Sequence, residues 1–436
     1  MKHLVTLSAV AMLVLGCSEK ELILEGERLD IRADENGVAP VAIAESTMKL
    51  GQALPKMTSG TWSQPMGSAA RTIVHASLSA QPAPLWSAKI GSGEGRKNRI
   101  TASPVIAGGR IFAMDANARV TAVNTAGGTI WSTDLTPANE RAGDASGGGV
   151  VVDGNTVYVT TGFARVHALD ASTGAVRWTQ KLDASVSAAP TVANGTVYAV
   201  SGNNTAWAIN AGTGRINWEI SGTPSQSGIA GGTGPAVIGS QVILPFSSGE
   251  IVSVDGASGA RNWGAFISGE RKGRAYSSIS ALSSGPIVAG DTVFAGNGAG
   301  RLATINIKTG ERGWSIKEGA YGPALPIGNS VYFVSDQAEF LRVERATGAV
   351  VWRQSLPLYT EKKVKKRDGT HGHFGPVFAG GRIWIASSDG VLRGMDPVTG
   401  ATTIEVPLSG GAASAPSVAG GTLYVMSTKG VLHAFR

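Results

Sequence analysis

The stretch DASTGAVRW, residues 170–178, decides the fold of this 436-residue chain, because close variants of it recur along the sequence. Each copy has a polar residue, a glycine turn and, after a short gap, a tryptophan. The other copies are NTAGGTIW (124–131), NAGTGRINW (210–218), DGASGARNW (255–263), NIKTGERGW (306–314), ERATGAVVW (344–352) and DPVTGATTI (396–404), where Ile404 replaces the tryptophan. Together with Trp86 they mark a period of about 45 residues, which is typical of stacked or radial repeat folds.

Each period is predicted to contain four β-strands. Residues 189–220 hold the runs APTVA, TVYAVS, TAWAIN and RINWEI, separated by turns at 194–195, 202–204 and 214. Short β-branched runs between Asn-Gly and Thr-Gly turns are typical of hairpins. An α-solenoid is disfavoured, because no repeat has an apolar i, i+3, i+4, i+7 stripe and the chain has 60 glycines. The sequence therefore predicts a four-stranded antiparallel meander in each repeat.

Eight such units can be counted, and the two ends of the chain complete one of them. The units begin at Pro104, Gly149, Pro190, Pro235, Pro286, Pro323, Pro376 and Pro416. The last unit stops at Arg436 after three strands, whereas LWSAKI, residues 85–90, resembles a fourth strand without its first three. Joining them removes exposed sheet edges. We therefore predict an all-β fold, an eight-bladed β-propeller whose closing blade is shared by the N- and C-terminal segments.

The first residues have the pattern of an export signal. MKHLVTLSAVAMLVLGC, residues 1–17, has one lysine before a short apolar run, as in a secretory signal peptide. Its end, VLGC, resembles the bacterial lipobox, in which the cysteine is acylated, and Cys17 is the only cysteine of the chain. The alternative is an incidental cysteine in an apolar run. The predicted organisation is a signal peptide at 1–16, a tether at 17–60 after lipidated Cys17, and a propeller at 61–436.

Net charge is +7, and much of the surplus lies in EKKVKKR, residues 361–367. A charge run of this kind is usually a solvated loop. The alternative is a patch that attracts acidic lipid or an acidic partner surface. Nucleic acid is not an expected partner, because no aromatic platforms for stacking bases accompany the run and an exported protein does not meet nucleic acid.

The predicted channel wall lacks the residues that catalysis needs. The first strands of the eight units, TASPVIA, GGGVVV, AAPTVA, TGPAVI, SGPIVA, YGPALP, FGPVFA and SAPSVA, contain no Asp, Glu, His, Lys or Arg. Calcium needs several oxygen ligands at one point, and acid–base catalysis needs a tuned pair. His371 and His373 are close in sequence, but no further ligands are suggested nearby. We expect no catalytic residue, metal or cofactor.

The repeats resemble those of the pyrroloquinoline quinone (PQQ) type propellers, which include two families. The quinoprotein dehydrogenases are larger enzymes that hold a quinone and calcium with carboxylates of the channel, and they commonly have a vicinal cysteine pair. This chain has neither the cysteine pair nor the carboxylates. The BamB family of outer-membrane assembly lipoproteins is similar in the lipobox, in LEGERLDIR (residues 24–32) and in all eight blades. This resemblance implies a non-catalytic subunit of the β-barrel assembly machinery. It would lie on the periplasmic face of the outer membrane, bind the POTRA domains of BamA and other subunits, and have unfolded outer-membrane proteins as further candidate partners.

The same resemblance implies that inter-blade loops contact BamA. In well-known members one loop carries Leu and Arg and a neighbouring loop carries two Asp; the corresponding stretches here are SGIAGGT (227–233) and SSISALS (278–284). Ile229 keeps the apolar side chain, but the charged positions hold Ala230, Ala281 and Ser283. Either the contact is rebuilt with the basic residues Arg271, Lys272 and Arg274, or these two stretches are not the ones that correspond to the family's loops. The candidate partner-binding residues are Ile229, Ala230, Gly231, Arg271, Arg274, Ile279, Ala281 and Ser283.

Two other functions stay open. A periplasmic PQQ-dependent oxidoreductase would use the same fold. A glycan-binding lipoprotein would need exposed aromatic side chains, for which the sequence offers Tyr276, Tyr321 and Tyr359.

Overall fold

The computed structural model describes residues 57–58, 60–229, 231–269, 271 and 278–436. The described residues belong to one compact unit. The expected signal peptide and Cys17, most of the tether, Ala230, Arg274 and Tyr276 lie outside the described residues. Within the described residues, no helix is both long and apolar enough to cross a membrane.

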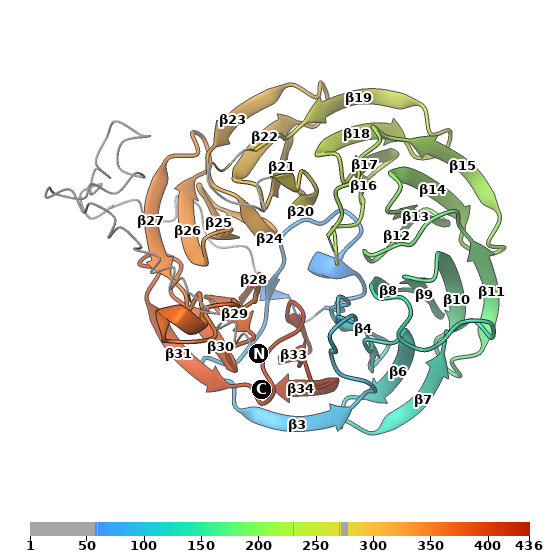
Figure 1. Ribbon diagram of the computed structural model, residues 1–436, viewed down its shortest axis with the longest axis horizontal. Coiled ribbons are helices and arrows are strands. Elements are labelled where there is room, and N and C mark those ends of the chain that lie inside the picture. Colours follow the sequence, from blue (N-terminus) through green and yellow to red (C-terminus); the bar gives the residue numbers. More distant parts are fainter. Residues whose placement is uncertain (1–56, 59, 230, 270, 272–277) are drawn as a thin grey trace, which may run out of the picture. The chain divides into compact units, whose positions relative to one another are not determined.

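The prediction of an eight-bladed propeller is confirmed, since eight blades of four antiparallel strands form a ring (Figure 1). Within each blade the four strands are given in order from the ring axis to the outer wall (Figure 1). Blade 1 is β4 (Val105–Ala107), β5 (Arg110–Met114), β6 (Arg119–Asn124) and β7 (Thr129–Asp134). Blade 2 is β8 (Gly148–Asp153), β9 (Thr156–Thr161), β10 (Arg165–Asp170) and β11 (Val176–Lys181). Blade 3 is β12 (Thr191–Ala193), β13 (Thr196–Val200), β14 (Thr205–Asn210) and β15 (Ile216–Ser221). Blade 4 is β16 (Ala236–Ile238), β17 (Gln241–Pro245), β18 (Glu250–Asp255) and β19 (Arg261–Phe266).

The remaining blades follow the same order. Blade 5 is β20 (Leu282–Ala289), β21 (Thr292–Asn297), β22 (Arg301–Asn306) and β23 (Arg312–Ile316). Blade 6 is β24 (Ala320–Ile327), β25 (Ser330–Ser335), β26 (Glu339–Glu344) and β27 (Val350–Ser355). Blade 7 is β28 (His373–Ala379), β29 (Arg382–Ser387), β30 (Val391–Met395) and β31 (Thr402–Pro407). Blade 8 is β32 (Ser417–Ala419), β33 (Thr422–Met426), β34 (Val431–Phe435) and, from the other end of the chain, β3 (Pro84–Lys89).

The ring closes as predicted, because β3 pairs antiparallel with β34. Ala83 N–H donates to the Arg436 carbonyl at 2.9 Å, and Arg436 N–H donates to the Ala83 carbonyl at the same distance. The outer edge of β34 is thereby satisfied by a segment about 350 residues earlier in the chain, so the closing blade has the same four strands as the others.

The recurring tryptophans connect neighbouring blades. In blade 1 the indole N–H of Trp131 donates to the carbonyl of Ala171, in the turn after the third strand of blade 2, at 3.0 Å. Gly174 of that turn has φ +74°, and a Cβ on it would come within 2.5 Å of the Trp131 ring. Glycine is therefore required both for the left-handed backbone and for the close approach of the ring. The same indole-to-carbonyl bond, at 2.8–3.0 Å, joins Trp86 to Thr125, Trp178 to Ala211, Trp218 to Gly256, Trp263 to Ile307, Trp314 to Arg345 and Trp352 to Val398.

Ile404 is the exception, and the ring closure explains it. Ile404 lies on β31, so a tryptophan at this position would face the turn between the third and fourth strands of blade 8. That turn does not exist, because β34 ends at Phe435 and β3 begins at Pro84. With no turn carbonyl to receive an indole N–H, an aliphatic side chain packs there against the core instead.

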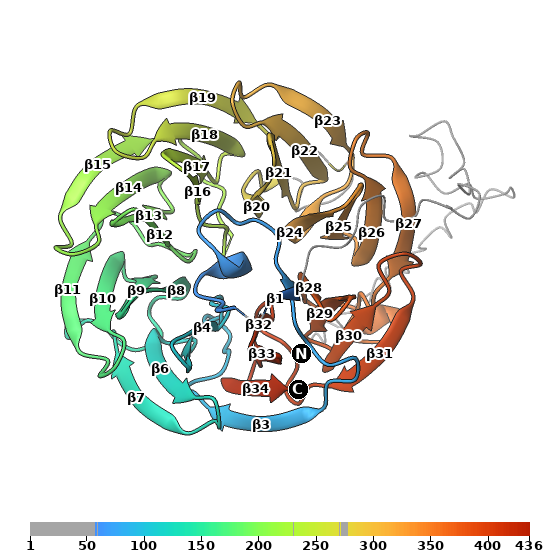
Figure 2. The ribbon, with the colours of Figure 1, turned by 180° about the vertical axis from the view of Figure 1, so that it is seen from behind.

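A segment that the repeat pattern did not reveal lines the axis. Residues 60–78, here called the channel strap, include a short 3-10 helix η1 (Pro65–Gly67) and strand β2 (His75–Ala76), which pairs with β1 (Met57–Thr58) and with β28 (Figure 2). The strap contacts inner strands in chain order around the ring. Its backbone or side-chain partners are Ile106, Val152, Val192, Val237, Val288, Ala379 and Gly421, in blades 1, 2, 3, 4, 5, 7 and 8.

The strap satisfies the inner edges of the blades. The inner strand of a blade is an edge strand with unpaired N–H and C=O groups. Trp62 exchanges two backbone hydrogen bonds with Ile106, at 2.9 and 2.8 Å. The Gln64 side chain does the same with Val192, at 2.8 and 3.0 Å, and Val237 N–H donates to Ala69 O at 2.9 Å. The partners lie beside the turns that follow the inner strands, so the strap covers the axis at that end of the ring.

Truncating the strap's main apolar anchor is expected to destabilise the propeller. Trp62 is 3% exposed within the largest core cluster, which spans blades 7, 8 and 1. Trp62→Ala should lower the free energy of unfolding by about 3–5 kcal/mol, the usual cost of a buried Trp-to-Ala cavity. Urea denaturation followed by circular dichroism measures the change, with Val398→Ala on an exposed turn as the control. A loss below about 1 kcal/mol would show that the strap is not part of the cooperative unit.

Candidate functional site

The histidine pair does not form a metal site. His373 begins β28 and is buried; its Nδ1 lies 2.7 Å from Ser387 Oγ and its Nε2 lies 2.9 Å from the Pro357 carbonyl. Since the carbonyl only accepts, Nε2 carries the proton and Nδ1 accepts from the serine hydroxyl. Both ring nitrogens are therefore engaged within the protein. Among the described residues, no group of three or more His, Cys, Asp or Glu side chains is placed to hold a metal ion.

Burial gives His373 a strong preference for the neutral form. Desolvation lowers the pKa of His373 to about 4, although the Pro357 carbonyl and the Asp389 charge favour its protonation. His167, buried on β10, has its pKa lowered to about 4 by the same cause. In both cases the unfolded chain takes up a proton at a higher pH than the folded chain does.

The stability of the fold should therefore fall as the pH drops from about 6.5 to about 4, since only the unfolded state is protonated in that window. His373→Gln removes one of these groups. The variant should be less stable than the unmodified protein, and this difference should be about 2 kcal/mol smaller at pH 5 than at pH 7. The reason is that the unmodified protein loses about 1.4 kcal/mol through His373 for each pH unit below 6.5, whereas the variant does not. Urea unfolding at both pH values measures this, with His371→Gln as the control. A penalty that is the same at both pH values would contradict the neutral state assigned to folded His373.

The axis does not fit the quinone and calcium centre of the related enzymes. Neither the strap nor the eight quoted inner-strand segments contain Asp or Glu. The charged group within the strap is Arg71, whose Nε donates to Pro235 O at 2.8 Å and whose Nη1 lies 3.4 Å from Thr233 Oγ1. Burial lowers the pKa of Arg71 to about 10. A calcium ion needs carboxylate or carbonyl oxygens and is repelled by a guanidinium, so these residues do not fit such a centre.

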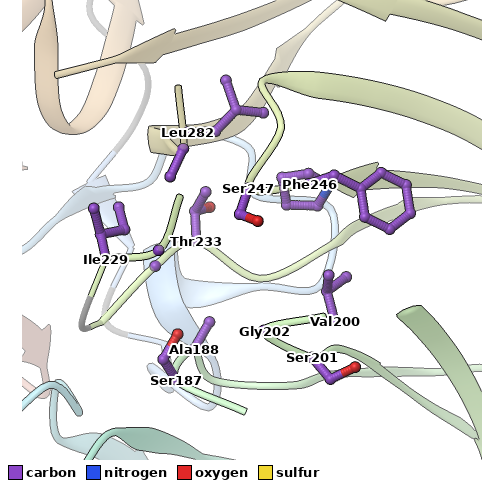
Figure 3. Close-up of a pocket in the computed structure, with 14 residues that line it drawn as sticks. Ser187, Ala188, Val200, Ser201, Gly202, Ile229, Thr233, Phe246, Ser247 and Leu282 are labelled. Carbon is purple, nitrogen blue, oxygen red and sulfur yellow. The ribbon is translucent and has the colours of Figure 1, made fainter. Parts of the chain in front are cut away.

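A pocket lies on the face where each blade connects to the next, here called the loop face. Because the strands of a blade alternate in direction, the turn between the second and third strands opens on the same face. The pocket lies over blades 3, 4 and 5 (Figure 3). It is lined by Ser187, Ala188, Val200, Ser201, Gly202, Gly228, Ile229, Gly232, Thr233, Pro245, Phe246, Ser247, Ala281 and Leu282.

This loop-face pocket joins the two loops that the sequence singled out. The hydroxyl of Ser227 lies 3.4 Å from the Ser278 carbonyl, and it accepts a hydrogen bond from Ser280 N–H at 3.3 Å. Ile229 of the first loop and Ala281 of the second then line the same hollow. The structure thus brings together stretches 227–233 and 278–284, which are about 50 residues apart in the chain.

Asn204 fixes the outer wall of the pocket. It is fully buried with φ +62°, a left-handed conformation that asparagine tolerates better than most residues. Its Nδ2 donates to Thr223 O at 2.7 Å, and its Oδ1 accepts from both N–H and Oγ of Ser247, at 2.8 and 2.6 Å. One amide therefore holds a turn of blade 3, the loop before blade 4 and a turn of blade 4. The sequence showed only a turn here, and no local pattern indicates these partners.

The first loop also reaches across the mouth of the channel. A Cβ on Gly231, which has φ +71°, would lie 3.0 Å from Cβ of Thr101, just before blade 1. From within the ring, Arg71 contacts Thr233 and the Pro235 carbonyl. The loop is thus held between the strap and the far wall of the channel.

The chemistry of the pocket is that of a binding site. None of its lining residues is ionisable. Ser201 Oγ is bonded to Asn203 and to the Thr205 carbonyl, and Ser247 Oγ to Asn204, so these hydroxyls have no adjacent base that would activate them. Partly exposed Ile229, with buried Leu282 and Phe246, offers an apolar floor with hydroxyls at the rim. Such a surface can bind an apolar side chain of a partner.

The remaining candidate residues differ in how available they are. Gly231 is exposed, and Ile279 is partly exposed. Ala281 is buried, and the Ser283 hydroxyl donates to the Ala320 carbonyl at 2.6 Å. Ile229 is therefore the large apolar side chain that the first loop presents at the pocket.

Arg271, in the connection between blades 4 and 5, takes part in an internal ion-pair network with residues at the start of blade 6 and within it. Its Nε lies 2.5 Å from Asp336 Oδ2, and its Nη2 lies 3.2 Å from Glu318 Oε2. Arg353 pairs with the same glutamate at 3.3 Å and with Glu339 at 3.1 Å. Burial raises the pKa of Glu318, opposed by the two arginines. Burial works to lower the pKa of Arg271, but its hydrogen bond and charge interaction with Asp336 raise it.

Arg271→Gln should destabilise the fold, because it removes a cation that lies against the buried Asp336 carboxylate. Breaking one side of a buried pair costs about 3–5 kcal/mol. We expect about 3 kcal/mol by urea unfolding, since Arg271 is 21% exposed. Lys308→Gln is the matched control, because its pair with Asp291 is exposed and should contribute less than about 1 kcal/mol. Equal stability of both variants would mean that Arg271 is free to serve a partner instead.

The fold and the pocket define a class of protein: a β-propeller of PQQ-like repeats with an uncharged pocket on its loop face. The profile of the family described as outer membrane protein assembly factor BamB matches residues 116–354 and 357–436. The chain belongs to this family.

Individual relatives agree. BamB of Salmonella typhimurium is 29% identical over 358 residues, covering 81% of this chain and 88% of the relative. BamB of Escherichia coli K12 is 28% identical over the same length, with the same coverage. The crystal structure of BamB from Moraxella catarrhalis superposes with a TM-score of 0.67 at 19% identity, over 81% of this chain and 99% of that one.

The fold alone does not separate assembly factors from enzymes. The quinohemoprotein alcohol dehydrogenase of Comamonas testosteroni has a TM-score of 0.63 at 15% identity, over 86% of this chain and 80% of the enzyme. Likeness at this identity concerns the fold only. The function has to be argued from the site.

Proposed function

We propose that this protein is a non-catalytic scaffold of the outer-membrane β-barrel assembly machinery, which binds the POTRA domains of BamA and assists the insertion of barrel proteins. The observation that carries the proposal is the neutral, apolar-floored pocket on the loop face of a chain in the BamB family. A rigid ring that presents such a pocket can position a partner without making or breaking a bond. Other subunits and unfolded outer-membrane proteins are further partners in this proposal.

Ile229 is the proposed anchor of the contact. Binding energy in protein interfaces concentrates in a few apolar or aromatic side chains that fill hollows and are ringed by polar groups. Ile229 lines the same pocket as Leu282, Ser187 and Thr233 (Figure 3). The backbone around it is held by the Ser227 bonds to the neighbouring loop, so little order has to be gained on binding.

The contact is proposed to rely on shape and backbone groups more than on charge. Arg271, a candidate for replacing the missing charges, is already paired with Asp336 and Glu318. Withdrawing it would remove one cation from the side-chain carboxylates of both Glu318 and buried Asp336. In this proposal Arg271 positions the loop between blades 5 and 6, while Ile229, Gly231 and Ile279 face the partner.

The location belongs to the same proposal. Residues 1–16 are proposed to be a cleaved signal peptide, acylated Cys17 to anchor the chain at the periplasmic face of the outer membrane, and residues 17–60 to link the anchor to the propeller. Two or more acyl chains are needed for stable anchoring, because each buried methylene contributes about 0.8 kcal/mol. Purification of the protein with BamA from detergent-solubilised membranes tests the assembly, and recovery of the propeller alone would count against it.

Ile229→Asp tests the pocket. A carboxylate in place of the apolar anchor would be desolvated on binding, so affinity for purified BamA POTRA domains should fall about thirty-fold or more, equivalent to about 2 kcal/mol. Isothermal titration calorimetry measures the affinity, and circular dichroism checks that the fold is retained. Val398→Asp, an exposed apolar residue on the opposite face, is the matched control and should bind normally. If both variants bind as the unmodified protein does, the pocket is not the docking site.

A further inference from the structure

A second surface on the loop face has a different character. The connection between β27 and β28, residues 356–372, forms an ordered projection, here called the basic hairpin. Its base is held by the Tyr359–Thr370 bridge and by hydrogen bonds from Thr360 N–H to Gly369 O at 3.1 Å and from His371 N–H to Leu358 O at 2.8 Å. Buried Leu356 and partly buried Leu358 join the core of blades 6 and 7. The hairpin is thus rigidly mounted on the ring.

The tip of the hairpin carries unpaired positive charge. It contains the cations Lys362, Lys363, Lys365, Lys366 and Arg367, against the acids Glu361 and Asp368, and all seven are exposed. In the described part of the chain, none of them lies within 4.0 Å of an oppositely charged group, whereas Arg271 and Arg353 elsewhere on this face are paired. The four lysines therefore have no ion-pair partner in the described structure.

An apolar side chain stands at the centre of this charge. The hairpin tip is a 3-10 turn, η3 (Val364–Lys366), and Val364 is 74% exposed, more than any other large hydrophobic side chain of the described residues. At the base, Tyr359 is 38% exposed and lies under the Arg367 guanidinium at 4.7 Å. This arrangement suits a membrane interface: basic residues surround an exposed apolar side chain at the tip, and an aromatic ring lies at the base.

The type of basic residue favours lipid over protein as the partner of the basic hairpin. Protein interfaces are enriched in arginine, with its planar fork of donors, and depleted in lysine. Four of the five cations here are lysines, and clusters of four to eight basic residues bind anionic lipid headgroups through additive electrostatic attraction. We infer that the basic hairpin is a membrane-contact element, which binds anionic phospholipid headgroups and inserts Val364 at the surface of the bilayer.

This contact is compatible with a partner in the loop-face pocket. The hairpin connects blades 6 and 7, while the pocket lies over blades 3 to 5. Contact through the hairpin would bring one edge of the loop face to the bilayer and leave the pocket edge to a protein. The inference does not depend on the proposed BamA contact, because it rests only on the charges and the tip of the hairpin.

A single label tests the inference. Residues 18–436 contain the whole compact unit and no cysteine, so Val364→Cys provides one thiol for an environment-sensitive dye. We expect the dye emission to shift to the blue with vesicles containing phosphatidylglycerol, and not with vesicles of phosphatidylcholine alone. The shift should weaken at high salt, which screens exposed charges. Replacing Lys362, Lys363, Lys365 and Lys366 with Gln should lower vesicle affinity about hundred-fold, at about 1 kcal/mol per basic residue with allowance for partial contact.

Val398→Cys, on the opposite face, is the matched label, and its dye should stay in water with both kinds of vesicle. An unshifted dye at position 364 with anionic vesicles would overturn the inference, as would equal shifts at 364 and 398. A dye at 364 that responds to an acidic protein of the membrane but not to anionic vesicles would also overturn it and assign the hairpin to a protein partner. Unchanged vesicle affinity after the lysine replacements would exclude the electrostatic mechanism.

Discussion

The contact on which this structure depends is the one between the tryptophan of a blade and the glycine turn of the next blade, which occurs in seven of the eight blades. Each indole N–H donates to a turn carbonyl, as from Trp131 to Ala171, and the ring lies where a Cβ on Gly174 would clash. A buried aromatic ring contributes both apolar area and a directed hydrogen bond, so the contact fixes the distance and the angle between blades. Seven such contacts, together with the pairing of β3 and β34 in blade 8, join the separate sheets into one ring.

Ring closure creates a further constraint at the axis. Eight inner strands bring eight unpaired edges together, and the channel strap pairs with seven of them. The space that a cofactor would need in a related enzyme is lined here by backbone groups, by Trp62 and by the Arg71 cation. The binding site that we propose lies on the loops instead of the axis. A shared fold with a dehydrogenase consequently carries no implication of shared chemistry.

Charges on the loop face are separated by role. Near the pocket, Arg271 neutralises Asp336 and Glu318, and the pocket itself is uncharged. The cations of the basic hairpin have no such partners in the described structure. Paired charges stabilise the loops of the ring, whereas unpaired ones leave a local positive potential that can attract an anionic surface. The two surfaces are therefore suited to different ligands.

The sequence by itself determined the strands, the number of blades and the way the ring closes, because each follows from local periodicity and from the turn chemistry of repeats such as residues 170–178. It also indicated Ile229 through a resemblance between loops. Tertiary structure alone decided the path of the strap, which has no repeat and binds strand edges that exist only after the blades assemble. It decided as well that Asn204 holds three loops, that Arg271 pairs with Asp336 and that Ile404 has no turn to contact. These outcomes depend on residues far apart in the chain, and local sequence patterns do not specify which distant groups a closed ring brings together.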